Sequence, residues 1–177
     1  MGVDLQAVIR AIPDFPKPGI VFRDVTTLMA DGPAFAESVA RLASPVRAGG
    51  YTAIAGIEAR GLVFGAAVAA ATGLGFVPIR KPGKLPATVL RESYELEYGR
   101  DALEIHHDAI AAEAKVFLID DLLATGGTLL AAATLIERLG GTVGGAGVVV
   151  DLPDLGGSRR LAERGIPLHT LVCFEGE

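Results

Sequence analysis

Short apolar runs alternate with longer segments of helical spacing along most of the chain. Runs typical of buried strands cover residues 51–57, 76–80, 115–120, 143–150 and 167–174. Apolar residues recur at helical spacing over residues 127–139. Helices are also expected over the almost wholly apolar run 61–75 and over the short segment 158–164, which Ser158 can cap. This order predicts an α/β fold, in which a central parallel sheet is flanked by helices and joined by right-handed crossovers. Because ligands of such sheets bind beyond the carboxyl ends of the strands, the loops after the strands are the first places to look for chemistry.

Two segments depart from this alternation. Residues 89–98 and 101–106 have side chains of alternating type around Gly99 and Arg100, which predicts a two-stranded β-ribbon. Residues 12–29 contain three prolines and Gly19, which predicts an extended, irregular segment that packs on the rest of the chain. We find no internal repeat and no domain linker, so all 177 residues are expected to form a single domain.

The composition narrows the classes of partner. Sixteen basic and 21 acidic residues give a net charge of −5, which argues against nucleic acid as the main partner because phosphate contacts require a basic surface. A small anionic ligand is still compatible, since a local site can be positive on an acidic protein. The single Cys173 excludes an internal disulfide and fits a reducing compartment, so we expect a cytoplasmic protein without a signal peptide. The apolar run 61–75 is shorter than the roughly 20 residues of a membrane span, so we interpret it as a buried helix.

The loop after the strand 115–120 carries the strongest chemical signal. Asp120 and Asp121 stand where this strand is expected to end, and their carboxylates can accept hydrogen bonds from the hydroxyls of a ribose. Backbone amides, hydroxyls and the positive end of the next helix then suit a phosphate. We call the residues that supply them the phosphate loop: Ala124, Thr125, Gly126, Gly127 and Thr128.

Gly-Gly-Thr by itself would indicate only an ordinary strand-to-helix turn with a capping hydroxyl. The paired acids before it make the pattern more specific. Gly-Lys-Thr is absent, which excludes the P-loop of nucleoside triphosphatases, and no G-x-G-x-x-G follows a strand to support a dinucleotide fold.

The run 116–128, Val-Phe-Leu-Ile-Asp-Asp-Leu-Leu-Ala-Thr-Gly-Gly-Thr, resembles the phosphoribosyl pyrophosphate signature of type I phosphoribosyltransferases. Its Leu-Leu-Ala spacer is similar to that of the adenine phosphoribosyltransferase branch. Four further segments resemble that branch and occur in its order, at residues 13–24, 56–61, 80–86 and 94–99. The resemblance therefore covers nearly the whole chain.

This resemblance implies a type I phosphoribosyltransferase fold with an N-terminal hood and a flexible β-ribbon loop. It divides the single domain 1–177 into an arm and base-covering hood over about 1–30, and a core over 31–177 with a mobile loop near 82–106. The implied reaction is transfer of the 5-phosphoribosyl group from phosphoribosyl pyrophosphate to adenine, giving AMP and pyrophosphate, as in purine salvage. The implied cofactor is Mg²⁺, which substrate and water would hold without direct protein ligands. A homodimer is implied as well, with neither nucleic acid nor a membrane as partner.

The family also assigns roles around the leaving group. Pyrophosphate would contact Ala59, Arg60, Gly61, Lys81 and Lys84, and the resemblance implies a non-proline cis peptide in the loop 56–61. Arg60 and Lys81 would act in catalysis with Glu97, which would handle the proton of the attacking base nitrogen beside Tyr98. The alternatives are a solvated Arg60, and a Glu97 that merely pairs with a lysine across the ribbon.

The base would lie under the hood, against Val21, Phe22 and Arg23. Backbone groups there can match the N6 donor and N1 acceptor of adenine. A 6-oxopurine reverses this pattern and would leave buried groups unpaired, at a cost of roughly 1–3 kcal/mol each. Two other functions stay open at this point: transfer to a 6-oxopurine, and a non-catalytic regulator that senses phosphoribosyl pyrophosphate. A panel of purine bases tests the first, and a gel shift without turnover would favour the second.

Overall fold

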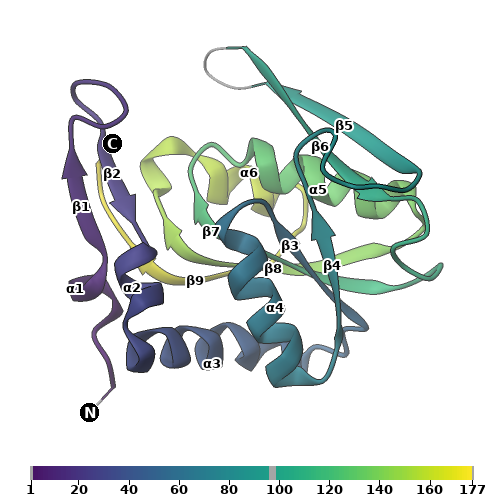
Figure 1. Ribbon diagram of the computed structural model, residues 1–177, viewed down its shortest axis with the longest axis horizontal. Helices are drawn as coiled ribbons and strands as arrows, with labels where there is room; N and C mark the ends of the chain where they lie inside the picture. Colours follow the sequence, from purple (N-terminus) through teal and green to yellow (C-terminus); the bar gives the residue numbers. More distant parts are fainter. Residues whose placement is uncertain (1, 96–98, 177) are drawn as a thin grey trace.

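A computed structural model describes residues 2–95 and 99–176 of the chain. Its centre is a five-stranded sheet in the order β4-β3-β7-β8-β9, and each neighbouring pair is parallel. The strands are β3 (Ala53–Ile57), β4 (Gly75–Ile79), β7 (Lys115–Leu123), β8 (Thr142–Asp151) and β9 (Leu168–Cys173). The predicted α/β architecture is therefore confirmed, and all five carboxyl ends lie at one edge of the sheet (Figure 1).

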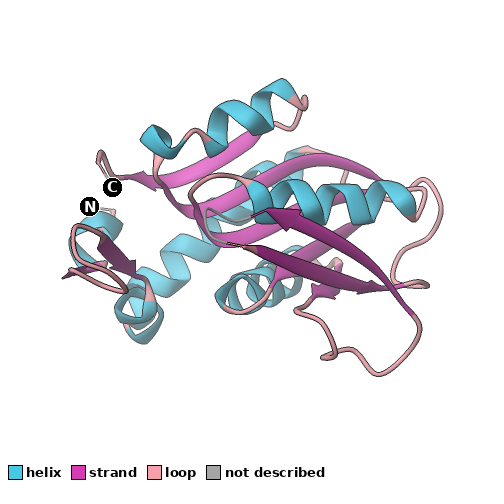
Figure 2. Cartoon of the chain, turned by 90° about the horizontal axis from the view of Figure 1, so that it is seen from above, coloured by secondary structure: helices cyan, strands magenta, loops and turns pink. Residues whose placement is uncertain are grey.

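Helices cover both faces of this sheet (Figures 1 and 2). One face packs against α3 (Gly32–Ala48) and α4 (Arg60–Thr72), and the other against α5 (Gly127–Arg138) and α6 (Gly157–Glu163). Successive side chains of a strand point to opposite faces, so Val116 and Leu118 join the core under α5 while Phe117 and Ile119 join the core over α4. This continuous apolar run is typical of a strand buried on both faces.

The pairing of β7 with β8 contains one irregularity. Val116 pairs with Val143, but Phe117 pairs with Gly145, so Gly144 is an extra residue in β8. A Cβ atom at Gly144 would lie 2.4 Å from Lys115 Cε, so the close packing here requires glycine. From this point the register continues to Leu123 opposite Asp151.

The apolar run 61–75 forms α4, a helix packed on β3. A Cβ atom at Gly65 would lie only 3.0 Å from Gly56 Cα, so two glycines allow helix and strand to approach closely. In the residues that the structure describes, no helix combines the length and the apolar character needed to cross a membrane.

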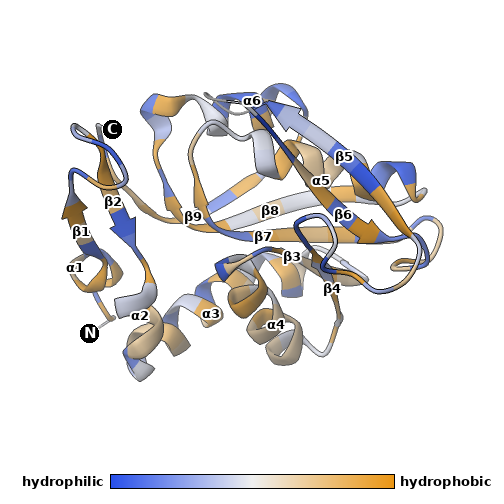
Figure 3. Ribbon diagram, turned by 45° about the horizontal axis from the view of Figure 1, so that its top comes forward, coloured by the Kyte–Doolittle hydropathy of each residue, from blue (hydrophilic) through white to orange (hydrophobic). Residues whose placement is uncertain are grey.

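The N-terminal segment is more regular than predicted. Short helices α1 (Leu5–Val8) and α2 (Thr26–Ala30) flank an antiparallel hairpin of β1 (Arg10–Pro13) and β2 (Val21–Asp24). The prediction of an irregular segment was wrong because the later prolines fall in the turn of the hairpin, where Asp14 Oδ1 accepts a hydrogen bond from the Gly19 N–H at 2.8 Å. Helix α3 was not predicted from the sequence. Figure 3 shows hydrophilic residues in this hairpin loop and hydrophobic ones along the central strands.

The predicted ribbon is present as β5 (Val89–Glu95) paired antiparallel with β6 (Arg100–His106). It lies across α5, where Tyr94 and Leu90 pack against the core beneath it. The chain then passes through a 3₁₀ turn, η1 (Pro153–Leu155), between β8 and α6.

Candidate functional site

Asp120 and Asp121 lie inside β7, because this strand continues to Leu123 rather than ending near residue 119 as expected. The extension has a simple cause: β8 keeps pairing with β7 as far as Asp151, whereas the register of β3 with β7 stops at Gly56 opposite Ile119. Both acids therefore lie beyond the last residue of β3 that pairs with β7, at the edge where the sequence predicts a site.

These two carboxylates have different surroundings. Each residue is only 6 % exposed, and Asp120 Oδ1 accepts a hydrogen bond from the Asp121 N–H at 2.8 Å. Burial and, second, the neighbouring charge of Asp121 raise the pKa of Asp120 well above its ordinary value. Asp121 Oδ2 instead accepts a hydrogen bond from Arg60 Nε at 2.5 Å. The pair thus combines one ion-paired carboxylate with one that is costly to ionise.

Arg60 reaches Asp121 from the loop after β3. We call Glu58, Ala59, Arg60 and Gly61 the cis-peptide loop, because the Glu58–Ala59 bond is cis, as the resemblance implied. A Cβ atom at Gly61 would lie 2.9 Å from both Asp120 Oδ1 and the Ile119 carbonyl oxygen. Glycine at this position therefore lets α4 begin directly against the two acids.

The phosphate loop connects β7 to α5 through a left-handed residue, since Gly126 has φ +84°. Its carbonyl groups face α6: Ala124 O accepts from the Gly157 N–H at 3.0 Å, and Thr125 O accepts from Arg160 Nη1 at 2.7 Å. Among residues 2–95 and 99–176, no acceptor takes a hydrogen bond from the N–H groups of residues 125–128. These amides stand at the positive end of α5 and are available to an anion.

Glu58 links the cis-peptide loop to the segment after β4. Its Oε2 accepts hydrogen bonds from the Lys81 N–H at 2.8 Å and from Arg80 Nε at 3.2 Å. Burial opposes ionisation of Glu58, but these two contacts outweigh it and lower its pKa. The hydrogen bond from the Lys81 N–H thereby fixes the backbone at that residue.

The Lys81 side chain turns toward the ribbon. Its ammonium pairs with Asp101 and donates to the Tyr94 hydroxyl at 3.1 Å. Burial alone would lower the pKa of Lys81, but the contacts with Asp101 and Tyr94 outweigh it and raise the value. Lys84 is exposed, and its carbonyl oxygen lies 3.5 Å from Arg80 Nη1. Sequence reasoning missed Glu58 and Asp101, since their contacts appear only once the ribbon and the two loops are folded together.

The hood residues lie beside the same edge. The Phe22 ring centre is 5.9 Å from the Arg60 guanidinium carbon and 5.3 Å from the Phe15 ring, which it meets edge to face. Arg23 stacks on the Phe174 ring, with its guanidinium carbon 4.1 Å from the ring centre, and Val21 is half-buried. The structure therefore brings Phe22 of β2 near Arg60.

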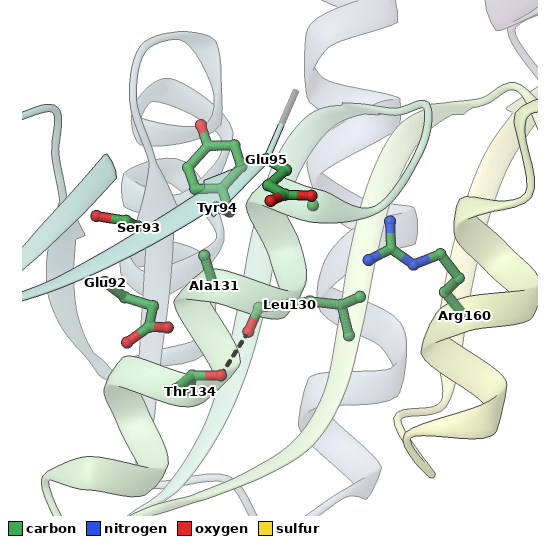
Figure 4. A pocket seen from close by; sticks show the side chains of 9 residues that line it. Glu92, Ser93, Tyr94, Glu95, Leu130, Ala131, Thr134 and Arg160 are labelled. Atoms are coloured by element: carbon green, nitrogen blue, oxygen red, sulfur yellow. Dashed lines mark hydrogen bonds between the residues drawn. The ribbon is translucent and has the colours of Figure 1, made fainter. Parts of the chain in front are cut away.

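The ribbon approaches the phosphate loop from the other side. A Cβ atom at Gly127 would lie 3.2 Å from Tyr94 Cδ2 and 3.4 Å from the Glu95 carbonyl oxygen. A cavity of about 390 Å³ opens between the ribbon, α5 and Arg160 (Figure 4). Glu97 and Tyr98 lie outside the described residues, between the end of β5 and the start of β6.

A candidate metal site made only of protein side chains is not present in the described part of the chain, where no three or more His, Cys, Asp or Glu are grouped to hold an ion. Asp120 and Asp121 supply two carboxylates as hard oxygen ligands, and the carboxylate of Asp121 is already paired with Arg60. That donor set fits a cation that keeps most of its ligands from water and from a bound phosphate compound.

Comparisons with known proteins agree with this geometry. A family model described as a phosphoribosyl transferase domain matches residues 26–165. An adenine phosphoribosyltransferase of Pectobacterium atrosepticum is 59 % identical over 168 residues, which cover 95 % of this chain and 91 % of that protein. The crystal structure of an adenine phosphoribosyltransferase from Thermoanaerobacter pseudethanolicus is 47 % identical with a TM-score of 0.92, covering 97 % and 98 % of the two chains. An APRTase from Giardia lamblia, complexed with 9-deazaadenine, is 32 % identical with a TM-score of 0.91 and 99 % coverage of both chains.

Proposed function

Because this chain belongs to the adenine phosphoribosyltransferases of the phosphoribosyl transferase family, we propose that it transfers the 5-phosphoribosyl group of phosphoribosyl pyrophosphate to adenine. The products are AMP and pyrophosphate, and the reaction salvages a purine base. The observation that carries the proposal is the phosphate loop, whose amides at the start of α5 are available to an anion directly beyond two buried acids. A sugar phosphate needs this combination of amide donors and carboxylate acceptors.

The phosphate loop, Ala124 to Thr128, binds the 5-phosphate in this proposal. Its glycines let the ligand approach the backbone, and Thr125 and Thr128 add hydroxyl donors. Asp120 and Asp121 hold the ribose hydroxyls. The ion pair with Arg60 supports this role for Asp121, because it fixes one carboxylate oxygen and leaves the other to accept from a sugar.

Pyrophosphate leaves toward the cis-peptide loop and the segment after β4. Ala59, Arg60 and Gly61 receive it, with Lys81 and Lys84 as further cations. A guanidinium binds phosphate oxygens in a forked, bidentate way, and fixed cations stabilise the charge that develops on a leaving diphosphate. Mg²⁺, bound mainly by the diphosphate, sugar oxygens and water, would neutralise more of that charge. The paired strand acids are compatible with this ion at a sugar but do not form a cage for it.

Adenine lies under β2, where Val21 and Arg23 offer backbone groups and Phe22 offers a ring. The base nitrogen N9 attacks C1 of the ribose as the bond from C1 to the pyrophosphate oxygen breaks. Glu97, assisted by Tyr98, takes the proton that N9 loses. The ribbon covers the site, since a ribosyl cation-like transition state must be shielded from water.

The test is turnover with Mg²⁺, phosphoribosyl pyrophosphate and a panel of adenine, hypoxanthine, guanine and xanthine. We expect AMP as the main product. Preferential formation of IMP, GMP or XMP would reject adenine as the substrate, and tight binding of phosphoribosyl pyrophosphate without any turnover would favour a sensor. Asp121→Asn should lower turnover without unfolding the protein, with the exposed Asp154→Asn as the control.

We also propose that the enzyme is a cytoplasmic homodimer. Val63, 41 % exposed on α4, is one of the few large apolar side chains left at the described surface of a single chain. Light scattering of the purified protein tests the dimer, and a monomer at catalytic concentrations would reject it.

A further inference from the structure

Arg160 of α6 contacts the backbone of the phosphate loop. It extends from α6 into the cavity beside the ribbon (Figure 4), and its Nη1 donates to Thr125 O at 2.7 Å. The neighbouring contact comes from the same helix, where the Gly157 N–H donates to Ala124 O at 3.0 Å. Two successive carbonyl groups of the loop are thus held from α6.

These contacts determine where the amides of the loop point. A peptide group is planar and trans, so the C=O of one residue and the N–H of the next point in opposite directions. With Thr125 O held by Arg160, the Gly126 N–H is directed away from that guanidinium. With Ala124 O held by Gly157, the Thr125 N–H is likewise directed away from its partner on α6. Both N–H groups have no acceptor among the described residues, so they are left for a ligand.

The backbone of the loop would otherwise be free to rotate at this point. Gly126 is a left-handed glycine and has no side chain to restrict its dihedral angles. The contact with Gly157 restrains Ala124, one peptide earlier, and the α5 hydrogen bond from the Leu130 N–H to Gly126 O restrains the peptide after it. Arg160 is therefore the side chain that restrains the peptide between Thr125 and Gly126.

We propose that Arg160 is a positioning residue, which orients the Thr125–Gly126 peptide so that its N–H binds the 5-phosphate. This inference rests on the proposed function of the phosphate loop, because Arg160 acts through that loop and not on substrate. Arg159 offers a matched control: it is an exposed arginine of the same helix, but its Nη2 lies 3.4 Å from the Cβ position at Gly156, near the start of its own helix.

The experiment compares Arg160→Gln, Arg160→Lys and Arg159→Gln with the unchanged protein. Calorimetry measures the dissociation constants of AMP and of adenosine, which lacks the phosphate, and steady-state kinetics gives kcat and the KM for phosphoribosyl pyrophosphate. Arg160→Gln should weaken AMP by about 10-fold and raise that KM similarly, with adenosine binding and kcat nearly unchanged. Arg160→Lys keeps a charged donor on a longer side chain than that of glutamine, so it should recover most of the loss, and Arg159→Gln should match the unchanged protein.

Equal effects of Arg160→Gln and Arg159→Gln would overturn the proposal, because they would show only the loss of a positive charge. Equal weakening of AMP and adenosine by Arg160→Gln would overturn it too, since that result indicates a general disturbance of the site. If the unchanged protein binds AMP no better than adenosine, the phosphate loop itself has been misassigned, and the proposed function fails separately from the role of Arg160.

Discussion

The cis-peptide loop and the phosphate loop leave adjacent parallel strands at the same edge of the sheet, but different contacts hold them. Charged side chains fix the first: Arg60 pairs with Asp121, and Glu58 pairs with Arg80. Backbone geometry fixes the second, through a left-handed Gly126 and two carbonyls bonded to α6. Ion pairs between side chains therefore hold the cis-peptide loop, whereas backbone conformation and hydrogen bonds to carbonyl groups hold the phosphate loop.

The difference has a consequence for binding. Arg60 of the cis-peptide loop is already paired with Asp121, so a diphosphate that binds Arg60 must either share the guanidinium with this carboxylate or displace it. The amides of the second loop have no acceptor in the described chain, so a phosphate can bind them without displacing an acceptor of that part of the protein. We therefore expect ligand binding at the cis-peptide loop to be sensitive to loss of charge, and binding at the phosphate loop to be sensitive to small changes of backbone shape.

The largest effect is expected for Arg60→Ala. It removes a cation proposed to stabilise the leaving diphosphate and leaves Asp121 without its ion-pair partner, so kcat should fall by a factor on the order of 10²–10³. Arg41→Ala is the control, because Arg41 also pairs with a carboxylate and its side chain is 41 % exposed, against 40 % for Arg60. Steady-state kinetics with adenine measures the difference, and a kcat within a few-fold of the control would contradict the charge-based view of this loop.

A smaller effect is expected for Gly126→Ala. A side chain at φ +84° costs about 1–2 kcal/mol, and its Cβ would lie 3.1 Å from Gly157 Cα. The KM for phosphoribosyl pyrophosphate should rise by about tenfold as the amides shift, with a lower melting temperature.

Gly140→Ala is the control that separates the rise in KM from the loss of stability expected for Gly126→Ala. Gly140 has φ +83° with no atom within 4 Å of its Cβ position, so it should show the loss of stability without the rise in KM. Equal KM values for the two variants would mean that the shape of the phosphate loop does not limit binding.

The smallest effect is a change in stability, which is expected for Asp120→Asn beside any loss of ribose binding. The pKa of Asp120 is raised in the folded protein, so folding favours its protonated form, and its contribution to stability is lost as pH rises above the ordinary carboxyl value of about 3.9. Asparagine cannot ionise and keeps an oxygen for the Asp121 N–H. The melting temperature of the variant should therefore exceed that of the unchanged protein by a margin that grows as the pH rises from 4 toward the raised pKa of Asp120 and is constant above it.

Thermal unfolding at several pH values measures this margin, with the exposed Asp108→Asn as control. A margin independent of pH would show that the buried acid is not costly to ionise. A more stable but less active Asp120→Asn would also indicate that the Asp120 carboxylate beside the phosphate loop serves activity at the expense of stability.

Much of this architecture could be predicted from local sequence pattern. The apolar runs 116–119 and 61–75 predicted β7 and α4, helical spacing predicted α5, and alternating side chains predicted the ribbon. The phosphate loop and the acids before it could be placed at the carboxyl edge from motif and topology alone. Helix α3 had a usable signal, since Asp31 accepts a hydrogen bond from the Ala34 N–H at 2.9 Å and Pro33 stands in the first turn. Pro45 inside the helix obscured its period.

The remaining features depend on contacts between distant segments. Nothing local to Asp101 indicates that it meets Lys81, and nothing local to Arg160 indicates that it meets Thr125. The length of β7 was also underestimated, because the strand is prolonged by its neighbour β8 and not by its own apolar run. Sequence patterns report the preferences of a segment, whereas these features arise from its neighbours.

The extra residue Gly144 affects the pairing of β8 far from its own position. It lies near the start of β8, yet it decides which residue of that strand stands opposite Asp120, now Val148. If the pairing of Val116 with Val143 continued without this extra residue, Gly147 would stand opposite Asp120, and each later side chain of β8 would lie on the other face of the sheet. One glycine near the amino end of β8 thus decides which side chains of that strand lie beside the two acids.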